Sequence, residues 1–140
     1  MVRERHWPSL QQAAESALIL LDTNALIWLH LGHRRAAGLL RTRRRLYVSP
    51  ATTLELAFLA EAGRIRLRGG ISPATLIESE PWPIDDPPAA RWFARAADVA
   101  WTRDPFDRLL VAHAQLRGWR LATGDTDLLR RLGPSASVEL

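Results

Sequence analysis

Residues Ala17–Asp22 read ALILLD, a short apolar run that ends directly on a carboxylate. A run this short with a polar end predicts a strand that is covered on both faces. Similar short runs occur at Leu46–Val48 and Trp119–Thr123, and helical segments separate them. Because strands that alternate with helices form parallel sheets with helices on both faces, we expect a three-layer α/β/α fold around a mostly parallel central sheet.

Start signals mark the helices between these strands. Ser49-Pro50, Ser72-Pro73 and Asp104-Pro105 each combine an N-cap residue with proline at the first helical position. The last of these helices should run to Gly118, a residue typical of helix ends. The other expected elements are helices at Pro8–Ala17, Asn24–Leu31, Arg34–Arg45 (with Ala36, Ala37, Leu39 and Leu40 inward), Asp86–Ala97 and Asp125–Leu132, and an edge strand at Ser137–Leu140.

Length and composition limit the classes of protein to consider. The 140 residues predict one domain, in which residues 1–16 are an extension without an assigned role. No apolar run reaches the length of a membrane span, and the N-terminus has no apolar signal region, so we expect a cytoplasmic protein. The absence of cysteine excludes disulfides, thiol nucleophiles and cysteine-based zinc sites. All 19 Lys and Arg positions are arginine, which excludes a Schiff-base or P-loop lysine.

The charge distribution suits a polyanionic partner. The net charge is +4, and it would be higher over the rest of the surface if several acids were gathered in one site. Arginines cluster between positions 34 and 45, and they could follow a phosphate backbone or form a solvated helix face. We predict substrate contacts at Arg41, Arg43, Arg44 and Arg45.

Four carboxylates occupy positions where a parallel sheet places ligand-binding groups. Asp22 ends the first strand, and Asp125 follows the strand Trp119–Thr123 after one glycine. Glu55 and Asp107 lie early in helices, whose starts face the same carboxyl edge of the sheet. All four side chains can therefore converge, although they come from separate segments.

Converging carboxylates need a positive counter-charge. Packed together, they raise one another's pKa, and a divalent cation with hard oxygen ligands, Mg²⁺ or Mn²⁺, removes that cost. Such a metal polarises a phosphate oxygen and orients or generates an attacking hydroxide, a reaction that needs no cysteine or lysine. Each acid also has a structural interpretation: Asp104 and Asp125 as helix caps, Asp107 in a capping box, and Glu55 on a solvated face.

Four segments together resemble the PIN-domain family, particularly its VapC toxins. The similarity spans about Leu18–Leu132 and keeps the order and spacing of the family's motifs. The matching segments are Leu20–Trp28 (LLDTNALIW), Val48–Ala57 (VSPATTLELA), Asp104–Ala114 (DPFDRLLVAHA) and Leu121–Asp125 (LATGD).

This resemblance implies an endoribonuclease toxin that uses Mg²⁺ or Mn²⁺, is neutralised by a cognate antitoxin and forms a homodimer. The arginine cluster could then receive an acidic segment of the antitoxin. The implied metal-binding and catalytic residues are Asp22, Glu55, Asp107 and Asp125. The implied supporting residues are Asn24, Thr123 and Asp104, and Asp127 is a rival for the place of Asp125.

The chain departs from the family pattern in places. Thr102 stands where relatives often have histidine, and Leu59 stands where lysine is common, so substrate contacts can differ. A haloacid-dehalogenase-like phosphatase also has an aspartate after a strand, but it needs a second aspartate where Asn24 stands, and a lysine. The other alternative is a PIN-like module that binds RNA or protein without turnover.

The aromatic residues divide into two groups. Trp28, Trp92 and Trp119 lie among apolar neighbours and are expected in the core. Trp82 and Trp101 lie in loops near helix starts, where they could pack or could stack on nucleic-acid bases. His113 lies in an apolar stretch and is expected to be a hydrogen-bonded core histidine.

Overall fold

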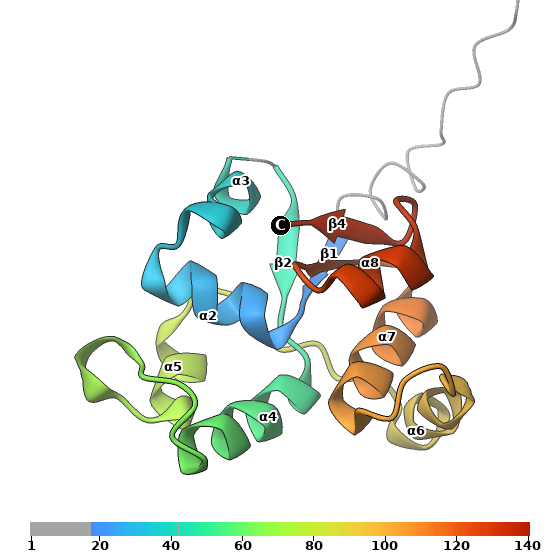
Figure 1. Cartoon of the computed structure of the whole chain (residues 1–140), viewed down its shortest axis with the longest axis horizontal. Coiled ribbons are helices and arrows are strands. Elements are labelled where there is room, and N and C mark those ends of the chain that lie inside the picture. The colour runs from blue at the N-terminus through green and yellow to red at the C-terminus, as the bar shows by residue number, and fades with distance from the viewer. Residues whose placement is uncertain (1–17, 42) are drawn as a thin grey trace, which may run out of the picture.

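A computed structural model describes residues 18–41 and 43–140, so the helix expected at Pro8–Ala17 lies outside the described residues. The described strands form one sheet in the order β2-β1-β3-β4, and every neighbouring pair is parallel (Figure 1). The strands are β1 (Leu18–Leu21), β2 (Arg45–Tyr47), β3 (Arg120–Thr123) and β4 (Ser137–Glu139). The register aligns Leu20 of β1 with Tyr47 of β2 and Leu121 of β3.

Helices follow the strands much as the sequence indicated. The α-helices are α2 (Thr23–Leu31), α3 (Ala37–Leu40), α4 (Pro50–Glu61), α5 (Pro73–Ser79), α6 (Ala89–Asp98), α7 (Pro105–Arg117) and α8 (Thr126–Leu132). Two 3₁₀ turns lie at Arg34–Ala36 and Arg68–Gly70. A bilayer-spanning helix would need a longer apolar stretch than any helix in residues 18–41 and 43–140 provides.

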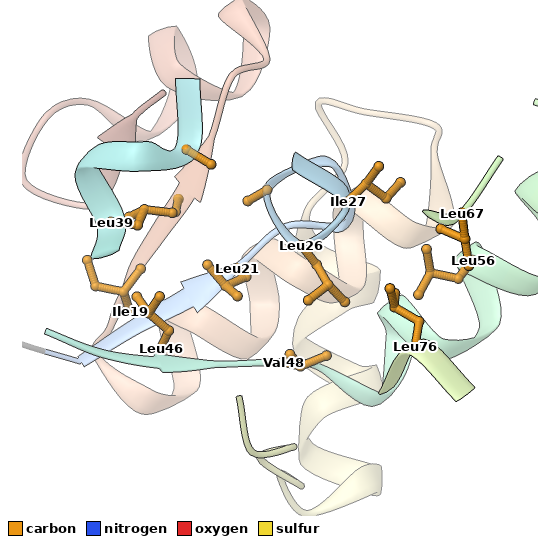
Figure 2. Close-up of a cluster of buried hydrophobic side chains, with 13 residues drawn as sticks. Ile19, Leu21, Leu26, Ile27, Leu39, Leu46, Val48, Leu56, Leu67 and Leu76 are labelled. Atoms are coloured by element: carbon orange, nitrogen blue, oxygen red, sulfur yellow. The ribbon is translucent and has the colours of Figure 1, made fainter. Parts of the chain in front are cut away.

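The alternation of side chains along β1 divides the core between the two faces of the sheet. Ile19 and Leu21 pack with residues of α2, α3, α4 and α5 (Figure 2), whereas Leu20 packs with residues of α6 and α7. Helix α4 contributes to both clusters, through Leu56 on one face and Ala51 on the other. The expected three-layer α/β/α fold is confirmed, with a sheet that is parallel throughout its described strands.

The long helix expected over Arg34–Arg45 is wrong. The segment forms a 3₁₀ turn and the single-turn helix α3, and Arg45 already belongs to β2, where it pairs with Leu18. Arg43 and Arg44 lie outside any helix, because they lead directly into the strand that begins at Arg45. Leu39 is buried as expected, but Leu40 is 59% exposed, because the short helix presents only one side to the core.

Helix α6 also begins later than expected, at Ala89 instead of next to Asp86. Pro87 and Pro88 have no backbone N–H, and the residues before them pair instead with Val48, which directly follows β2. Val48 N donates to Pro83 O at 2.9 Å, and Asp85 N donates to Val48 O at 3.0 Å. This connection fixes the position of Asp85 beside the sheet.

Candidate metal centre

A cavity of about 280 Å³ opens at the carboxyl edge of the sheet. Side chains from four elements line it, including all four carboxylates that the sequence singled out: Asp22, Glu55, Asp107 and Asp125. Asn24 lines it as well, together with Thr23 and Arg64. The parallel topology therefore brings together the acids that stand far apart in the sequence.

Asp22 is held at the end of β1, where it is only 6% exposed. Its Oδ1 accepts a hydrogen bond from Ala25 N at 2.7 Å and so caps the start of α2. Burial raises the pKa of Asp22 to about 6, although hydrogen bonds from Thr123 and Ala25 act in the opposite direction. Glu55 and Asp125 raise this pKa further through charge repulsion.

Glu55 faces the cavity from the middle of α4. Thr23 Oγ1 donates a hydrogen bond to Glu55 Oε1 and lies 3.3 Å from the buried Thr52 Oγ1. Burial raises the pKa of Glu55, with an added contribution from the charge of Asp104, while the Thr23 hydrogen bond lowers it. Thr23 thus orients the Glu55 carboxylate. The sequence did not assign Thr23 to the site, and the only signal it offered was the position of Thr23 directly after Asp22.

Asp107 lies in the first turn of α7, and its pKa is strongly raised. Burial raises its pKa to about 7, and Asp104, Asp125, Glu55 and Asp22 add to the shift through like-charge repulsion. In the described part of the chain, no group donates a hydrogen bond to its carboxylate. Among the described residues, none therefore compensates its negative charge through a hydrogen bond.

Asp125 and Asp104 both cap helices as well as contributing charge. Asp125 Oδ1 accepts from Asp127 N and Leu128 N at the start of α8, and Asp125 N donates to the buried Thr123 Oγ1 at 3.0 Å. Asp104 Oδ1 accepts from Phe106 N and Asp107 N at the start of α7. The rival Asp127 does not line this cavity and instead forms an ion pair with Arg130 at 2.8 Å.

Gly124 allows the backbone before Asp125 to lie against two side chains. A Cβ at this position would come within 2.6 Å of Trp28 Cη2 and 2.8 Å of Arg35 Nη2, which is closer than real contacts permit. The Arg35 guanidinium lies 4.4 Å from the Trp28 ring centroid, so the two side chains form one stacked unit. Trp28, expected in the core, is only partly buried against it, and its ring contacts the segment that carries Asp125.

The donor set of the cavity fits a hydrated divalent cation. All four side chains offer carboxylate oxygens, the ligands that Mg²⁺ and Mn²⁺ prefer. Within residues 18–41 and 43–140, however, no three Asp, Glu or His side chains are grouped closely enough to hold a metal by themselves. Mg²⁺ usually keeps several waters and uses one or two carboxylates, so this spacing suits it.

The predicted substrate contacts Arg41, Arg43, Arg44 and Arg45 do not lie at this cavity. They lie between α3 and the first residue of β2, and Arg45 pairs with Leu18 at the start of β1. In a parallel sheet this is the amino edge, opposite the carboxyl edge where the acids gather. The arginine that does line the acidic cavity is Arg64, which follows α4 and carried no motif in the sequence.

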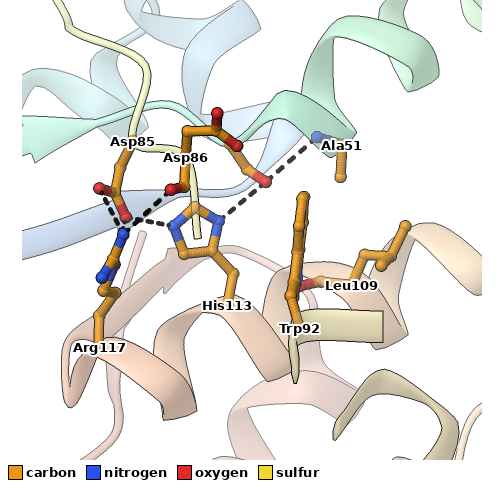
Figure 3. A network of polar contacts seen from close by, with 8 residues as sticks. Ala51, Asp85, Asp86, Trp92, Leu109, His113 and Arg117 are labelled. Atoms are coloured by element: carbon orange, nitrogen blue, oxygen red, sulfur yellow. Dashed lines mark hydrogen bonds and ion pairs between the residues drawn. The ribbon is translucent and has the colours of Figure 1, made fainter. Parts of the chain in front are cut away.

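A second polar network joins the start of α4 to α7 (Figure 3). His113 Nδ1 lies 3.0 Å from Ser49 Oγ, which caps α4, and His113 Nε2 lies 2.7 Å from Asp85 Oδ2. Arg117 Nε donates to the same Asp85 oxygen at 2.8 Å. His113 is fully buried, as expected of a core histidine, and the network fixes the helices that carry Glu55 and Asp107.

The remaining tryptophans differ in their surroundings. Trp92 is buried in the core, where its Nε1 donates to Leu109 O at 2.8 Å, and Trp119 is partly buried against the same cluster. Trp82 packs against the other cluster. Trp101, in the loop between α6 and α7, is 36% exposed.

Comparisons with known proteins agree with this architecture. The chain superposes on one chain of a toxin–antitoxin complex from Klebsiella pneumoniae with a TM-score of 0.62 and 22% identity, covering 87% of this chain and 99% of that chain. It also superposes on one chain of VapBC2 from Rickettsia felis, solved bound to a DNA fragment from their promoter. The TM-score is 0.62 and the identity 14%, and the superposition covers 88% of this chain and 98% of that chain. No curated protein matches by sequence.

The sequence profile of the PIN domain matches residues 19–133. This range begins at the second residue of β1 and contains β2, β3, all four cavity carboxylates and every helix from α2 to α8. The chain therefore belongs to the PIN domain family.

Proposed function

We propose that this protein is an endoribonuclease that depends on Mg²⁺ or Mn²⁺ and hydrolyses RNA phosphodiester bonds. The observation that carries the proposal is the convergence of four carboxylates, two of them with pKa values raised to about 6 and about 7, in one cavity at the carboxyl edge of the sheet. Membership of the PIN domain family supports the same reaction class. Groups whose pKa is strongly altered by burial and neighbouring charge are typical of functional sites.

In this proposal Asp22, Glu55, Asp107 and Asp125 would together hold a hydrated metal, directly or through its waters. A bound divalent cation would supply the charge that polarises the scissile phosphate and lowers the pKa of the attacking water. The protein keeps the carboxylates in place: Ala25 N fixes Asp22, Thr23 orients Glu55, and the helix cap fixes Asp125. Arg64 offers a cation at the rim for the substrate's phosphate.

We further propose that the protein is the toxin of a toxin–antitoxin pair and acts on RNA in the cytoplasm. Support comes from its fold, which it shares with proteins solved as toxin–antitoxin complexes. In this proposal the protein forms a homodimer and is neutralised by a cognate antitoxin. The arginines at the amino edge of the sheet, Arg41 to Arg45, are then available to an acidic antitoxin segment or to a distant part of the RNA.

A cleavage assay tests the proposed activity. Purified protein is incubated with structured RNA in Mg²⁺, in Mn²⁺ and in EDTA, alongside Asp22→Asn and Asp107→Asn variants. We expect cleavage only with metal and only with the unaltered acids. Asp98→Asn is the matched control, because Asp98 is an exposed aspartate on α6 outside the cavity.

Two results would contradict the proposal. If EDTA-treated protein cut as fast as the metal-loaded form, the metal-dependent reaction would be wrong. If the protein bound metal and RNA but cut no RNA under any of these conditions, it would be a binding module without turnover.

A further inference from the structure

A second cavity, of about 200 Å³, adjoins the acidic one and shares Asp107 and Asp125 with it. Its other walls include Trp101, Thr102 and Arg131. The volume is below the 300–1,000 Å³ typical of pockets for whole ligands. It is therefore suited to one flat group of a longer molecule whose next group lies at the acids.

Trp101 offers such a group a surface for stacking. Trp101 is 36% exposed, although tryptophan residues are on average highly buried. The Arg131 guanidinium lies 5.8 Å from the ring centroid, a cation–π distance that orders both side chains. Arg130 is paired with Asp127, whereas Arg131 makes no ion pair with any described residue.

The loop that carries Trp101 is fixed from α7. Arg108 Nε donates to Thr102 O at 2.7 Å, and Arg108 Nη1 donates to Ala97 O at 3.4 Å. These bonds hold the backbone on both sides of Trp101. Because Arg108 directly follows Asp107 on the same helix, the stacking surface and the carboxylate keep a constant relative position.

The electrostatics of the site make such a surface useful to an RNA substrate. The acids repel the phosphates of an approaching RNA, and a bound cation offsets only part of that repulsion. Stacking of a base on an aromatic ring adds affinity that does not depend on charge, and it accepts every base. The unpaired Arg131 can meet a phosphate next to the stacked base.

From this geometry we infer that Trp101 stacks on a base of the RNA next to the cleaved phosphate and that Arg131 contacts the adjoining backbone. The inference rests on the proposed ribonuclease function and adds to it a base-binding subsite. It requires that the base at this position is unpaired, because a paired base does not expose its face.

The test compares two fluorescein-labelled probes by fluorescence anisotropy, a short oligouridylate and the same oligomer with abasic riboses. Binding is measured with Ca²⁺ in place of Mg²⁺, and gels verify that the probes stay intact. We expect wild-type protein to bind the base-containing probe about tenfold more tightly than the abasic one. Trp101→Ala should remove this difference, and Trp101→Phe should keep most of it.

Two further variants separate stacking from charge and from general surface effects. Arg131→Gln should weaken the binding of both probes and reduce its salt dependence. Phe93→Ala is the matched control, since Phe93 is an exposed aromatic on α6 outside both cavities, and its binding should equal that of the wild type.

The outcomes also distinguish this inference from the proposed function. RNA cleavage by wild type together with equal binding of both probes by wild type and Trp101→Ala would overturn the subsite and leave the ribonuclease intact. Base-dependent binding through Trp101 without any cleavage would support the subsite and overturn the enzyme. A Trp101→Ala variant that keeps RNA binding but loses association with its antitoxin would place Trp101 in a protein interface, and the subsite would be wrong.

Discussion

Two polar regions connect α4 to α7, and they shift the pKa of their aspartates in opposite directions. In the network around His113, Asp85 accepts hydrogen bonds from His113 and Arg117, which outweigh its burial and hold its pKa below the usual value. In the acidic cavity, Asp107 is surrounded by like charges, and its pKa is raised to about 7. Asp85 has its cationic partner within the described protein, whereas no described cation bonds to Asp107.

The difference separates a structural carboxylate from a functional one. A buried charge with a hydrogen-bonded partner stabilises one particular arrangement of the chain. Here the network holds the start of α4 against α7, through Ser49 and His113, and joins α7 to Asp85 through Arg117. A group of unpaired carboxylates instead costs stability, and the cost is removed only by protons or by a cation from outside. The four predictions below test this contrast.

The largest effect is expected from Asp107→Asn on catalysis. The substitution keeps the size of the side chain but removes one metal-binding charge, so RNA cleavage should fall by roughly a thousandfold, equivalent to ~4 kcal/mol. Single-turnover cleavage in Mg²⁺ measures the effect. Asp85→Asn, in the satisfied network, should lower the cleavage rate far less at a temperature well below unfolding. Comparable losses in both variants would contradict the division into two kinds of carboxylate.

Asp85→Asn should instead have the larger effect on stability. The substitution removes the ionic partner of Arg117 and His113, and we expect the free energy of unfolding to fall by about 2 kcal/mol. Urea denaturation at pH 7 measures this change. His113→Gln in the same background should add little further loss, because the two residues belong to one network. Additive losses would show that the network does not act as a unit.

Gly124→Ala tests whether the acidic cavity depends on close packing from outside. The added methyl group would clash with Trp28 and Arg35, so we expect a loss of about 1 to 2 kcal/mol in stability and weaker metal binding through displacement of Asp125. Gly38→Ala is the control: nothing lies within 4 Å of the new methyl group, and α3 should gain slightly. Equal stability of Gly124→Ala and wild type would show that the Trp28 and Arg35 side chains can move aside at no cost in free energy.

The smallest effect is a change in the melting temperature, Tm, with pH in EDTA. Folding raises the pKa of Asp22 to about 6 and that of Asp107 to about 7, so the folded protein keeps protons that the unfolded chain releases. Their contribution to stability is therefore present near pH 4 and is lost as the pH rises to about 7. The pKa of His113 is lowered by burial, so its contribution is lost in the opposite direction, as the pH falls below 6.5.

The difference in Tm between wild type and Asp107→Asn isolates the acidic cavity. At pH 8 in EDTA, Asp107→Asn should melt about 3 °C higher than wild type, and at pH 4 the two should coincide. Mg²⁺ should raise the Tm of wild type at pH 8 more than that of the variant. If wild type melts at a higher temperature than Asp107→Asn at pH 8 without metal, repulsion between the carboxylates does not destabilise the folded protein.

Much of the fold could be predicted because it depends on local patterns. The short apolar runs and the serine–proline and aspartate–proline helix starts each report on a few neighbouring residues, and the strands and helices formed close to those positions. Asp22, Asp107 and Asp125 stand at a strand end or at helix starts, which are local signals, and Glu55 lies within the helix that Ser49-Pro50 begins. The parallel topology made the convergence of the four acids a geometric consequence.

The basic surface could not be predicted in this way. A cluster of arginines between positions 34 and 45 is visible in the sequence, but which edge of the sheet it occupies depends on how β2 pairs with β1. Arg64 and Arg131 stand apart in the sequence and showed no pattern, yet one lines the acidic cavity and the other its neighbour. The partner of His113, Asp85, lies in a proline-rich connector whose path is set by pairing with β2.

The sequence by itself determined the order of strands and helices, the family and the set of candidate metal ligands, since each is encoded in short segments that form their own structure. Only the tertiary structure decided which carboxylates lie beside a cation and which lie beside other carboxylates. Asp85 and Asp107 are both aspartates near helix starts, and only the packing of α7 against the sheet gives the first an arginine and a histidine and the second four negative neighbours. Electrostatic energy depends on distances in space, which local sequence does not specify.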